Sequence, residues 1–187
     1  LIFSSIFILL LSPIFLLISI LIKITSKGPI FYTQKRYGLD SKSFRIIKFR
    51  SMSVLERDDQ ECLHQAKYND PRITKIGKYL RMWSLDELPQ LFNVFIGNMS
   101  IVGPRPHAVS HNEKYRKLIT GYMQRHSFKP GMTGLAQIYD LRGETKELND
   151  MKLRIKADLL YNSNWDIFLD FSILIRTLMR IKSKKAY

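Results

Sequence analysis

The first 22 residues form one apolar segment. They contain no charged side chain, and 17 of the 22 are Leu, Ile or Phe. As a single α-helix they would measure about 33 Å, and the hydrocarbon core of a bilayer is about 30 Å thick. The pattern therefore predicts a helix that lies in a membrane.

A serine–proline pair, Ser12-Pro13, lies in the middle of this segment. The proline removes the hydrogen bond to the carbonyl of Leu9, and the serine hydroxyl can satisfy a freed backbone group. Two arrangements follow from the residues alone. One is a kinked helix that spans the bilayer, and the other is a re-entrant helix-break-helix, with halves of about 16 Å, that dips into one leaflet and returns. Four basic side chains at residues 23–36 place the far end in the cytoplasm.

Two short β-prone runs follow, at residues 30–33 and 44–49, with a turn at Gly38-Leu39-Asp40 between them. This pattern predicts a small β-hairpin. Four basic side chains lie on or beside its second arm: Lys42, Arg45, Lys48 and Arg50. Their number alone indicates a solvated face or a contact with lipid headgroups.

Helical periodicity dominates the rest of the chain. Residues 73–81 and 113–126 each predict a basic amphipathic helix, and residues 56–69 a loop or surface helix. Residues 151–160 and 165–181 predict two more helices. The last has a broad apolar face and a basic end, which suits a helix in the membrane interface, while packing on the domain core is the alternative.

These patterns predict a mainly α fold with a small β-hairpin. We expect a membrane helix at residues 1–24, and a compact cytoplasmic domain at residues 25–187 surrounded by interfacial amphipathic helices. The chain carries 30 Lys+Arg against 16 Asp+Glu, a formal net charge of +14, which indicates an anionic partner. Nucleic acid is not the expected partner, because no reader motif is present and the basic residues adjoin apolar, membrane-seeking segments. The single cysteine, Cys62, excludes an internal disulfide.

Two adjacent carboxylates, Asp86 and Glu87, lie in the stretch SLDELPQLFNV. Ser84 and Glu87 match a capping box, and Pro89 places the helix start nearer residue 85 or 86. The carboxylates could simply cap this helix. They could also form a site, because neighbouring side chains on a helix point about 100° apart and can take separate roles. The same helix end would bind a phosphate.

Further on, Arg105 lies between two prolines, which restrict its backbone to extended geometry and present its guanidinium stiffly to diphosphate oxygens. The stretch Lys129-Pro130-Gly131 suits a type II turn, and Gly134 allows a close backbone approach.

The ordered motifs resemble the bacterial sugar transferase family, the monotopic phosphoglycosyl transferases that act on polyprenyl phosphate. They are Ser12-Pro13, KFRSM, SLDELPQLFNV, SIVGPRP, KPGMTGLAQ and LRGET. The run PHAVSHNEKYRKLITGYMQRH and the ending KKAY resemble undecaprenyl-phosphate glucose phosphotransferases that start exopolysaccharides such as colanic acid. Many of those enzymes have an extra N-terminal membrane region, so we expect this chain to be the C-terminal part of a longer protein.

The resemblance implies separate roles for the two carboxylates. Asp86 would be the nucleophile that attacks a UDP-sugar, expels UMP and holds the phosphosugar until undecaprenyl phosphate takes it. Glu87 would bind Mg²⁺. Three basic positions, Lys48, Arg81 and Arg105, would neutralise the diphosphate, and Arg142 would lie near the nucleotide or sugar.

The resemblance also favours the re-entrant membrane helix and a place in the bacterial inner membrane, with the catalytic domain on the cytoplasmic face. The expected partners are a UDP-sugar, undecaprenyl phosphate and membrane lipids, and a homo-oligomer stays open. UDP-glucose is the leading donor. Asn98 and Leu135 depart from the family pattern, so UDP-galactose or a UDP-N-acetyl amino sugar is the alternative. A peripheral membrane scaffold without chemistry is the alternative from another class.

Overall fold

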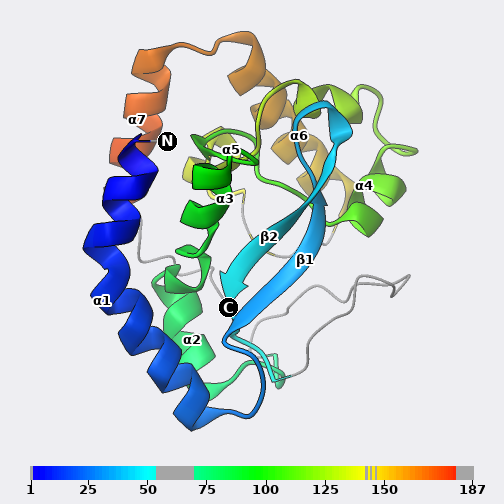
Figure 1. The fold of residues 1–187 in the computed structure, drawn as a ribbon. Coiled ribbons are helices and arrows are strands. Elements are labelled where there is room, and N and C mark those ends of the chain that lie inside the picture. Colours follow the sequence, from blue (N-terminus) through cyan, green and yellow to red (C-terminus); the bar gives the residue numbers. More distant parts are fainter. Residues whose placement is uncertain (1, 54–69, 142, 144, 146, 180–187) are drawn as a thin grey trace.

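The structure is a computed structural model that describes residues 2–53, 70–141, 143, 145 and 147–179 (Figure 1). Its helices are α1 (Ile2–Thr25), α2 (Lys75–Met82), α3 (Gln90–Ile96), α4 (Val109–Tyr115), α5 (Leu135–Ile138), α6 (Leu148–Ser163) and α7 (Ile167–Met179). Its strands are β1 (Phe31–Tyr37), β2 (Ser43–Phe49), β3 (Ser100–Val102) and β4 (Gly131–Thr133). The prediction of a mainly α fold with a small hairpin is confirmed, whereas the segment at residues 56–69 lies outside the described residues.

The N-terminal apolar segment is one helix, α1, with Pro13 inside it. The Ser12 hydroxyl donates a hydrogen bond to the Leu9 carbonyl at 2.7 Å, as predicted for the group that the proline frees. The expected interruption at Ser12-Pro13 therefore takes the form of a proline within a continuous helix, and Figure 1 shows α1 curving along the molecule.

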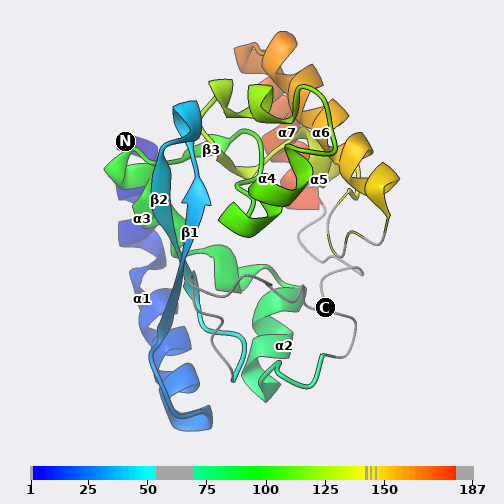
Figure 2. The same cartoon turned by 90° about the vertical axis from the view of Figure 1, so that its right-hand side faces the viewer.

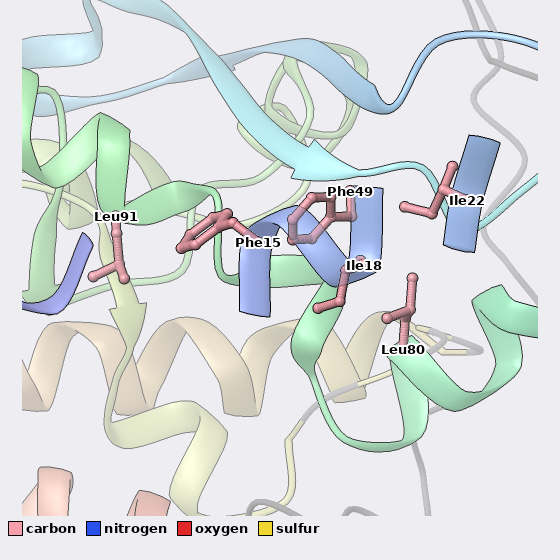
Figure 3. Close-up of a cluster of buried hydrophobic side chains, with 6 residues drawn as sticks. All are labelled: Phe15, Ile18, Ile22, Phe49, Leu80 and Leu91. Atoms are coloured by element: carbon pink, nitrogen blue, oxygen red, sulfur yellow. The ribbon is translucent and has the colours of Figure 1, made fainter. Parts of the chain in front are cut away.

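One side of α1 packs on the rest of the protein. Six buried side chains from four elements form this core (Figure 3): Phe15, Ile18 and Ile22 of α1, Phe49 of β2, Leu80 of α2 and Leu91 of α3. The other side of α1 is exposed, with Leu9 75% and Leu16 64% accessible. Helix α1 is thus an integral part of the fold as well as an apolar surface.

The hairpin β1–β2 is antiparallel, with Phe31 opposite Phe49 and Tyr37 opposite Ser43. In Figure 2 it crosses in front of α1. Helix α3 attaches to it through Asn93, whose amide accepts from Ile47 N at 2.9 Å and donates to the Arg45 carbonyl at 2.7 Å. Because these are two backbone groups of β2, Asn93 fixes the register between β2 and α3.

The basic cluster of the second hairpin arm is not one solvated face. Arg50 is only 2% exposed, and its guanidinium donates to the Ser26 carbonyl at 2.8 Å and to the Lys27 carbonyl. These carbonyls belong to the two residues that directly follow α1, so Arg50 caps the C-terminal end of the helix. Lys48 points elsewhere, to the candidate site described below.

A second pair of strands, β3 and β4, was not predicted. They run parallel, with Ser100 opposite Gly131 and Val102 opposite Thr133. Because Gly131 enters this strand without a positive φ, the predicted type II turn is wrong. The close approach predicted for Gly134 is confirmed, since a Cβ there would lie 2.1 Å from the carbonyl oxygen of Gly103.

The single helix predicted for residues 113–126 is wrong. Helix α4 ends at Tyr115, Gly121 adopts the left-handed conformation with φ 76°, and a 3₁₀ helix follows at Tyr122–Ser127. Glycine accepts this geometry at no steric cost, so the chain turns there instead of continuing as a helix.

Helices α6 and α7 confirm the last two predicted helices. The packing of α7 on the core is confirmed, because Ile173 is fully buried there. The membrane-interface interpretation stays a prediction, which fits the 80% exposure of Phe168 and the 68% exposure of Leu178. Figure 1 shows α1 and α7 along the same side of the molecule, and both helices carry exposed apolar residues.

Candidate active site

The two carboxylates lie in a tight 3₁₀ turn between α2 and α3, at Leu85–Glu87. The predicted capping box is wrong: Ser84 has φ 55° and its side chain makes no cap hydrogen bond. Helix α3 begins only after Pro89, which occupies its N-cap. Because proline has no backbone N–H to continue the preceding turn, the chain makes a separate 3₁₀ turn before α3.

Glu87 points to two basic side chains instead of back to Ser84. Lys48 of β2 donates to Glu87 Oε1 at 2.7 Å. Arg105 binds both oxygens, with Nη1 donating to Oε2 at 3.0 Å and Nη2 to Oε1. This is the bidentate fork that arginine forms with a carboxylate.

These contacts fix the charge of Glu87. Burial alone would raise its pKa, but the charges and hydrogen bonds of Arg105 and Lys48 outweigh burial and hold the pKa well below the usual range. Glu87 is therefore ionised throughout the neutral range. Burial also lowers the pKa of the Lys48 ammonium, and the negative charge of Glu87 opposes that shift.

Asp86 has a different environment. Its carboxylate accepts no hydrogen bond from any residue that the structure describes. Burial raises its pKa to about 6, and the neighbouring negative charge of Glu87 acts in the same direction, against Lys48, Arg81 and Arg105. Asp86 is thus ionised near neutral pH and has free lone pairs, as a carboxylate nucleophile requires.

The structure brings together Asp86, Glu87, Lys48, Arg81 and Arg105. Arg81, in the last turn of α2, lowers the pKa of Asp86, and its own side chain has no ion-pair partner within the described part of the chain. Lys48 lies in β2 and Arg81 in α2, the two carboxylates lie in the turn before α3, and Arg105 follows β3. Because these elements are far apart in the chain, spacing along the sequence could not group the five residues. Their chemical roles stay predictions.

The remaining predicted substrate residue, Arg142, lies outside the described residues. Sequence reasoning also missed Asn93, which holds α3 against the strand that carries Lys48. The available signal was a polar residue in the otherwise apolar stretch LFNVF, and Asn93 is only 1% exposed.

Of the two carboxylates in the site, Glu87 is the predicted ligand of Mg²⁺. Oε1 of Glu87 accepts two hydrogen bonds and Oε2 accepts one, which leaves a lone pair on Oε2. The described residues contain no cluster of three His, Cys, Asp or Glu side chains that could hold a metal. Mg²⁺ is commonly held by one or two carboxylates together with substrate phosphates and water, and Glu87 fits that kind of site.

Comparison with known proteins gives matches over nearly the whole chain. A family model described as bacterial sugar transferase matches residues 1–184. The chain is 56% identical over 185 residues to a UDP-glucose:undecaprenyl-phosphate glucose-1-phosphate transferase of Klebsiella pneumoniae, which covers 98% of this chain and 39% of that protein. It therefore spans about two fifths of that relative.

Two further relatives have different names. The exopolysaccharide production protein PSS of Rhizobium leguminosarum bv. phaseoli is 44% identical over 182 residues, which is 95% of this chain and 90% of that protein. A UDP-N-acetylgalactosamine-undecaprenyl-phosphate N-acetylgalactosaminephosphotransferase of Aeromonas hydrophila is 38% identical over 170 residues, 91% of this chain and 39% of that protein.

Proposed function

The chain belongs to the bacterial sugar transferase family, and on that premise we propose that it transfers a hexose-1-phosphate from a UDP-sugar to undecaprenyl phosphate. The observation that carries the proposal is the difference between the two adjacent carboxylates. Glu87 is held by Lys48 and Arg105, whereas Asp86 has no hydrogen-bond partner among the described residues. A carboxylate that only capped a helix would instead bind the backbone N–H groups of the next turn.

In the first proposed step, an oxygen of Asp86 attacks the sugar-bearing phosphorus of the UDP-sugar. A P–O bond forms to Asp86, the P–O bond to the UMP oxygen breaks, and UMP leaves with that electron pair. In the second step, an oxygen of undecaprenyl phosphate attacks the same phosphorus, and the Asp86 carboxylate leaves. The product is undecaprenyl-diphospho-sugar, the first intermediate of an exopolysaccharide repeat unit.

The basic residues would lower the barrier for both steps, because each step brings an anion to a phosphate. Arg105 and Lys48 already converge on one carboxylate, and Arg81 lies near enough to lower the pKa of Asp86. Such fixed cations stabilise charge that develops on the transferring phosphoryl group. When bound, Mg²⁺ would neutralise diphosphate oxygens, with Glu87 Oε2 as its protein ligand.

UDP-glucose is the proposed donor. The Klebsiella relative, at 56% identity, is named for UDP-glucose, and the Aeromonas relative named for UDP-N-acetylgalactosamine is 38% identical. UDP-galactose or a UDP-N-acetyl amino sugar is the alternative, because no described residue of the site distinguishes one sugar from another.

We place the protein in the bacterial inner membrane, with the catalytic domain at residues 25–187 on the cytoplasmic face and α1 entering one leaflet and returning. Among the described residues, Ser4–Thr25 is long and apolar enough to cross a membrane by length and composition. Helix α7 lies on the same side of the molecule as α1 and also carries exposed apolar residues. Both features support association with lipid.

The test is UMP release from a panel of UDP-sugars. Purified protein with Mg²⁺ and undecaprenyl phosphate should release UMP from UDP-glucose faster than from UDP-galactose or UDP-N-acetylgalactosamine. A faster reaction with another sugar would change the donor only. If none of the UDP-sugars releases UMP, the transferase proposal is wrong and a non-catalytic membrane scaffold becomes the better interpretation.

A further inference from the structure

The backbone around Arg105 is held mainly through its carbonyl oxygens. Residues 104 and 106 are prolines and have no backbone N–H to donate. Each carbonyl accepts a hydrogen bond from a different element: Pro104 O from Gly131 N at 2.9 Å, Arg105 O from Arg125 Nη2 at 2.5 Å and Pro106 O from Arg36 Nη1 at 3.4 Å. The carbonyl next to the Arg105 side chain is therefore held by the side chain of Arg125.

Arg125 is itself fixed on several sides. Its Nε and Nη2 lie 2.9 Å and 2.6 Å from Oδ2 of Asp158 on α6. Its guanidinium carbon lies 5.8 Å from the centre of the Tyr122 ring, whose hydroxyl is 2.7 Å from His107 Nδ1. These contacts leave the guanidinium of Arg125 little freedom to move.

The ion pair between Arg125 and Asp158 is almost completely buried, with side chains 1% and 2% exposed. Buried ion pairs lose the hydration of both charges, and apolar replacements of similar volume are often as stable or more stable. Stability alone is therefore a weak reason for such a pair. Its direct contact with the Arg105 carbonyl supplies a functional one.

We propose that Arg125, held by Asp158, is a positioning residue for Arg105 in the sugar-phosphate transfer proposed above, on which this inference rests. The connection runs from α6 through Arg125 to the Arg105 carbonyl, and from the Arg105 guanidinium to both oxygens of Glu87. A shift of that carbonyl moves the guanidinium away from the carboxylate and from the diphosphate. Displacements of about 1 Å at a reacting centre can reduce a rate about a hundredfold.

The first test is a double-mutant cycle between Arg125→Lys and Arg105→Lys, read as UMP release from UDP-glucose. Lysine keeps the charge beside Asp158 but lacks the planar fork that reaches two acceptors. We expect Arg125→Lys to slow the reaction about tenfold or more, and by less than about twofold when Arg105 is already lysine. Equal factors in both backgrounds would overturn the proposal.

Arg50→Lys is the matched control. Arg50 is as buried as Arg125, at 2% exposure, and it also donates to backbone carbonyls, but those carbonyls end α1. Its effect on UMP release should therefore be the same in the presence and in the absence of Arg105. If the Arg50 cycle showed the same non-additivity as the Arg125 cycle, a general loss of packing would account for both.

A second measurement requires no turnover. The Arg105 guanidinium would bind the diphosphate of the donor, so its displacement should weaken the binding of UDP in Arg125→Lys but not in Arg50→Lys, as measured by isothermal titration calorimetry. An unchanged Kd for UDP in Arg125→Lys would overturn the proposal even if the protein released no UMP, a result that would contradict the proposed function separately.

If Arg125→Lys does not fold, the variant Arg125→Met/Asp158→Leu removes both buried charges together. We expect it to keep a cooperative thermal transition and to lose UMP release at least tenfold, because the Arg105 carbonyl has lost its donor. Full activity in this folded variant would contradict a positioning role. UMP release by the unsubstituted protein is measured alongside. If that protein also releases no UMP, the proposed function is wrong, and the loss in the variant says nothing about a positioning role.

Discussion

Lys48 Nζ lies 2.7 Å from Glu87 Oε1, which joins the hairpin to the turn before α3. The next two residues of the chain contact the N-terminal helix and its end: Phe49 packs on Phe15 of α1, and Arg50 caps the C-terminus of α1. Three consecutive residues therefore connect α1 to the charge that orders the candidate site. A lipid substrate held beside α1 would be close to the same groups.

The first prediction concerns the division of roles between the carboxylates. Asp86→Asn should reduce UMP release at least about a thousandfold and abolish the covalent phosphosugar adduct, because an amide is a poor nucleophile. Glu87→Gln should retain the adduct and require more Mg²⁺. Adduct formation is measured by intact-protein mass spectrometry after incubation with UDP-glucose.

Asp40→Asn is the control for that experiment. Asp40 lies in the hairpin turn with φ 52°, a conformation that asparagine tolerates well. The substitution Asp40→Asn removes one carboxylate outside the candidate site, so it should leave the rate of UMP release unchanged. An adduct of normal yield in Asp86→Asn would exclude Asp86 as the nucleophile.

The second prediction is a fall of activity at acidic pH. Because the pKa of Asp86 is raised to about 6, its carboxylate becomes protonated below that pH and cannot attack phosphorus. The rate constant for UMP release should fall about tenfold per pH unit well below pH 6. A rate that stays constant down to about pH 4.5 would show that no group with this pKa must be ionised.

The same shift predicts a change in stability. The folded-state pKa of Asp86 is raised from 3.8 to about 6, so between these values the folded protein binds more protons than the unfolded chain. Stability contributed by this group is present below pH 3.8 and is lost as pH rises through 6. Asp86→Asn should therefore have a higher Tm than the unsubstituted protein at neutral pH, and a smaller difference at pH 4 (roughly the lower end of the window). Thermal unfolding of both proteins at the two pH values measures this.

The third prediction concerns the backbone contact beside Arg105. A Cβ at Gly134 would lie 2.1 Å from the Gly103 carbonyl oxygen, where neither backbone can move without separating β3 from β4. Gly134→Ala should cost about 2–4 kcal/mol in the free energy of unfolding, or roughly 5–15 °C in Tm, and should also reduce UMP release.

Gly97→Ala is the matched control, because Gly97 has φ 92° but a new Cβ there would meet only the flexible end of Lys129, with Nζ at 4.0 Å. It should cost only about 1 kcal/mol, from backbone strain alone. Equal losses in the two variants would mean that the contact with Gly103 contributes nothing to stability.

Local patterns predicted the elements that local forces dominate. The hairpin, α2, α6 and α7 all follow from periodicity and turn residues, and Thr74 caps α2 by accepting from Gly77 N at 2.9 Å. The helix predicted for residues 113–126 is interrupted instead: α4 ends at Tyr115, and Gly121 takes a left-handed conformation at the start of the 3₁₀ helix. The apolar spacing could not reveal this interruption.

The candidate site shows the limit of sequence reasoning more sharply. The pairing of Glu87 with Lys48 and Arg105 joins residues 39 and 18 positions apart, so no spacing rule contains it. A capping box and a site residue look identical in sequence at Glu87. Lys48 and Arg50 are likewise indistinguishable in sequence. Lys48 binds Glu87 in the site, whereas Arg50 is buried and binds the carbonyls at the end of α1.

The fourth prediction concerns the apolar side of α7. Trp165 precedes this helix and is 51% exposed, and Ile167 and Phe168 in the first turn of the helix are 60% and 80% exposed. In a Trp83→Phe background, the fluorescence of Trp165 should be quenched strongly by brominated lipids and weakly by aqueous acrylamide, because aromatic side chains at such a surface lie at the headgroup level. The opposite order of quenching would place α7 in water.

The fifth prediction is the topology of α1. Its packed residues run from Ile8 to Ile22, about 21 Å of helix, against residues of α2, α3 and β2. If α1 crossed a hydrocarbon core of about 30 Å, those elements would enter it as well, including the basic side chains of α2. Re-entry into one leaflet avoids that cost. In a Cys62→Ser background, single cysteines replacing Ile2 and Lys27 should therefore react with a membrane-impermeant maleimide from the same side of oriented vesicles. Labelling of the two positions from opposite sides would establish a spanning helix, and the residues packed on α1 would then have to separate from it in the membrane.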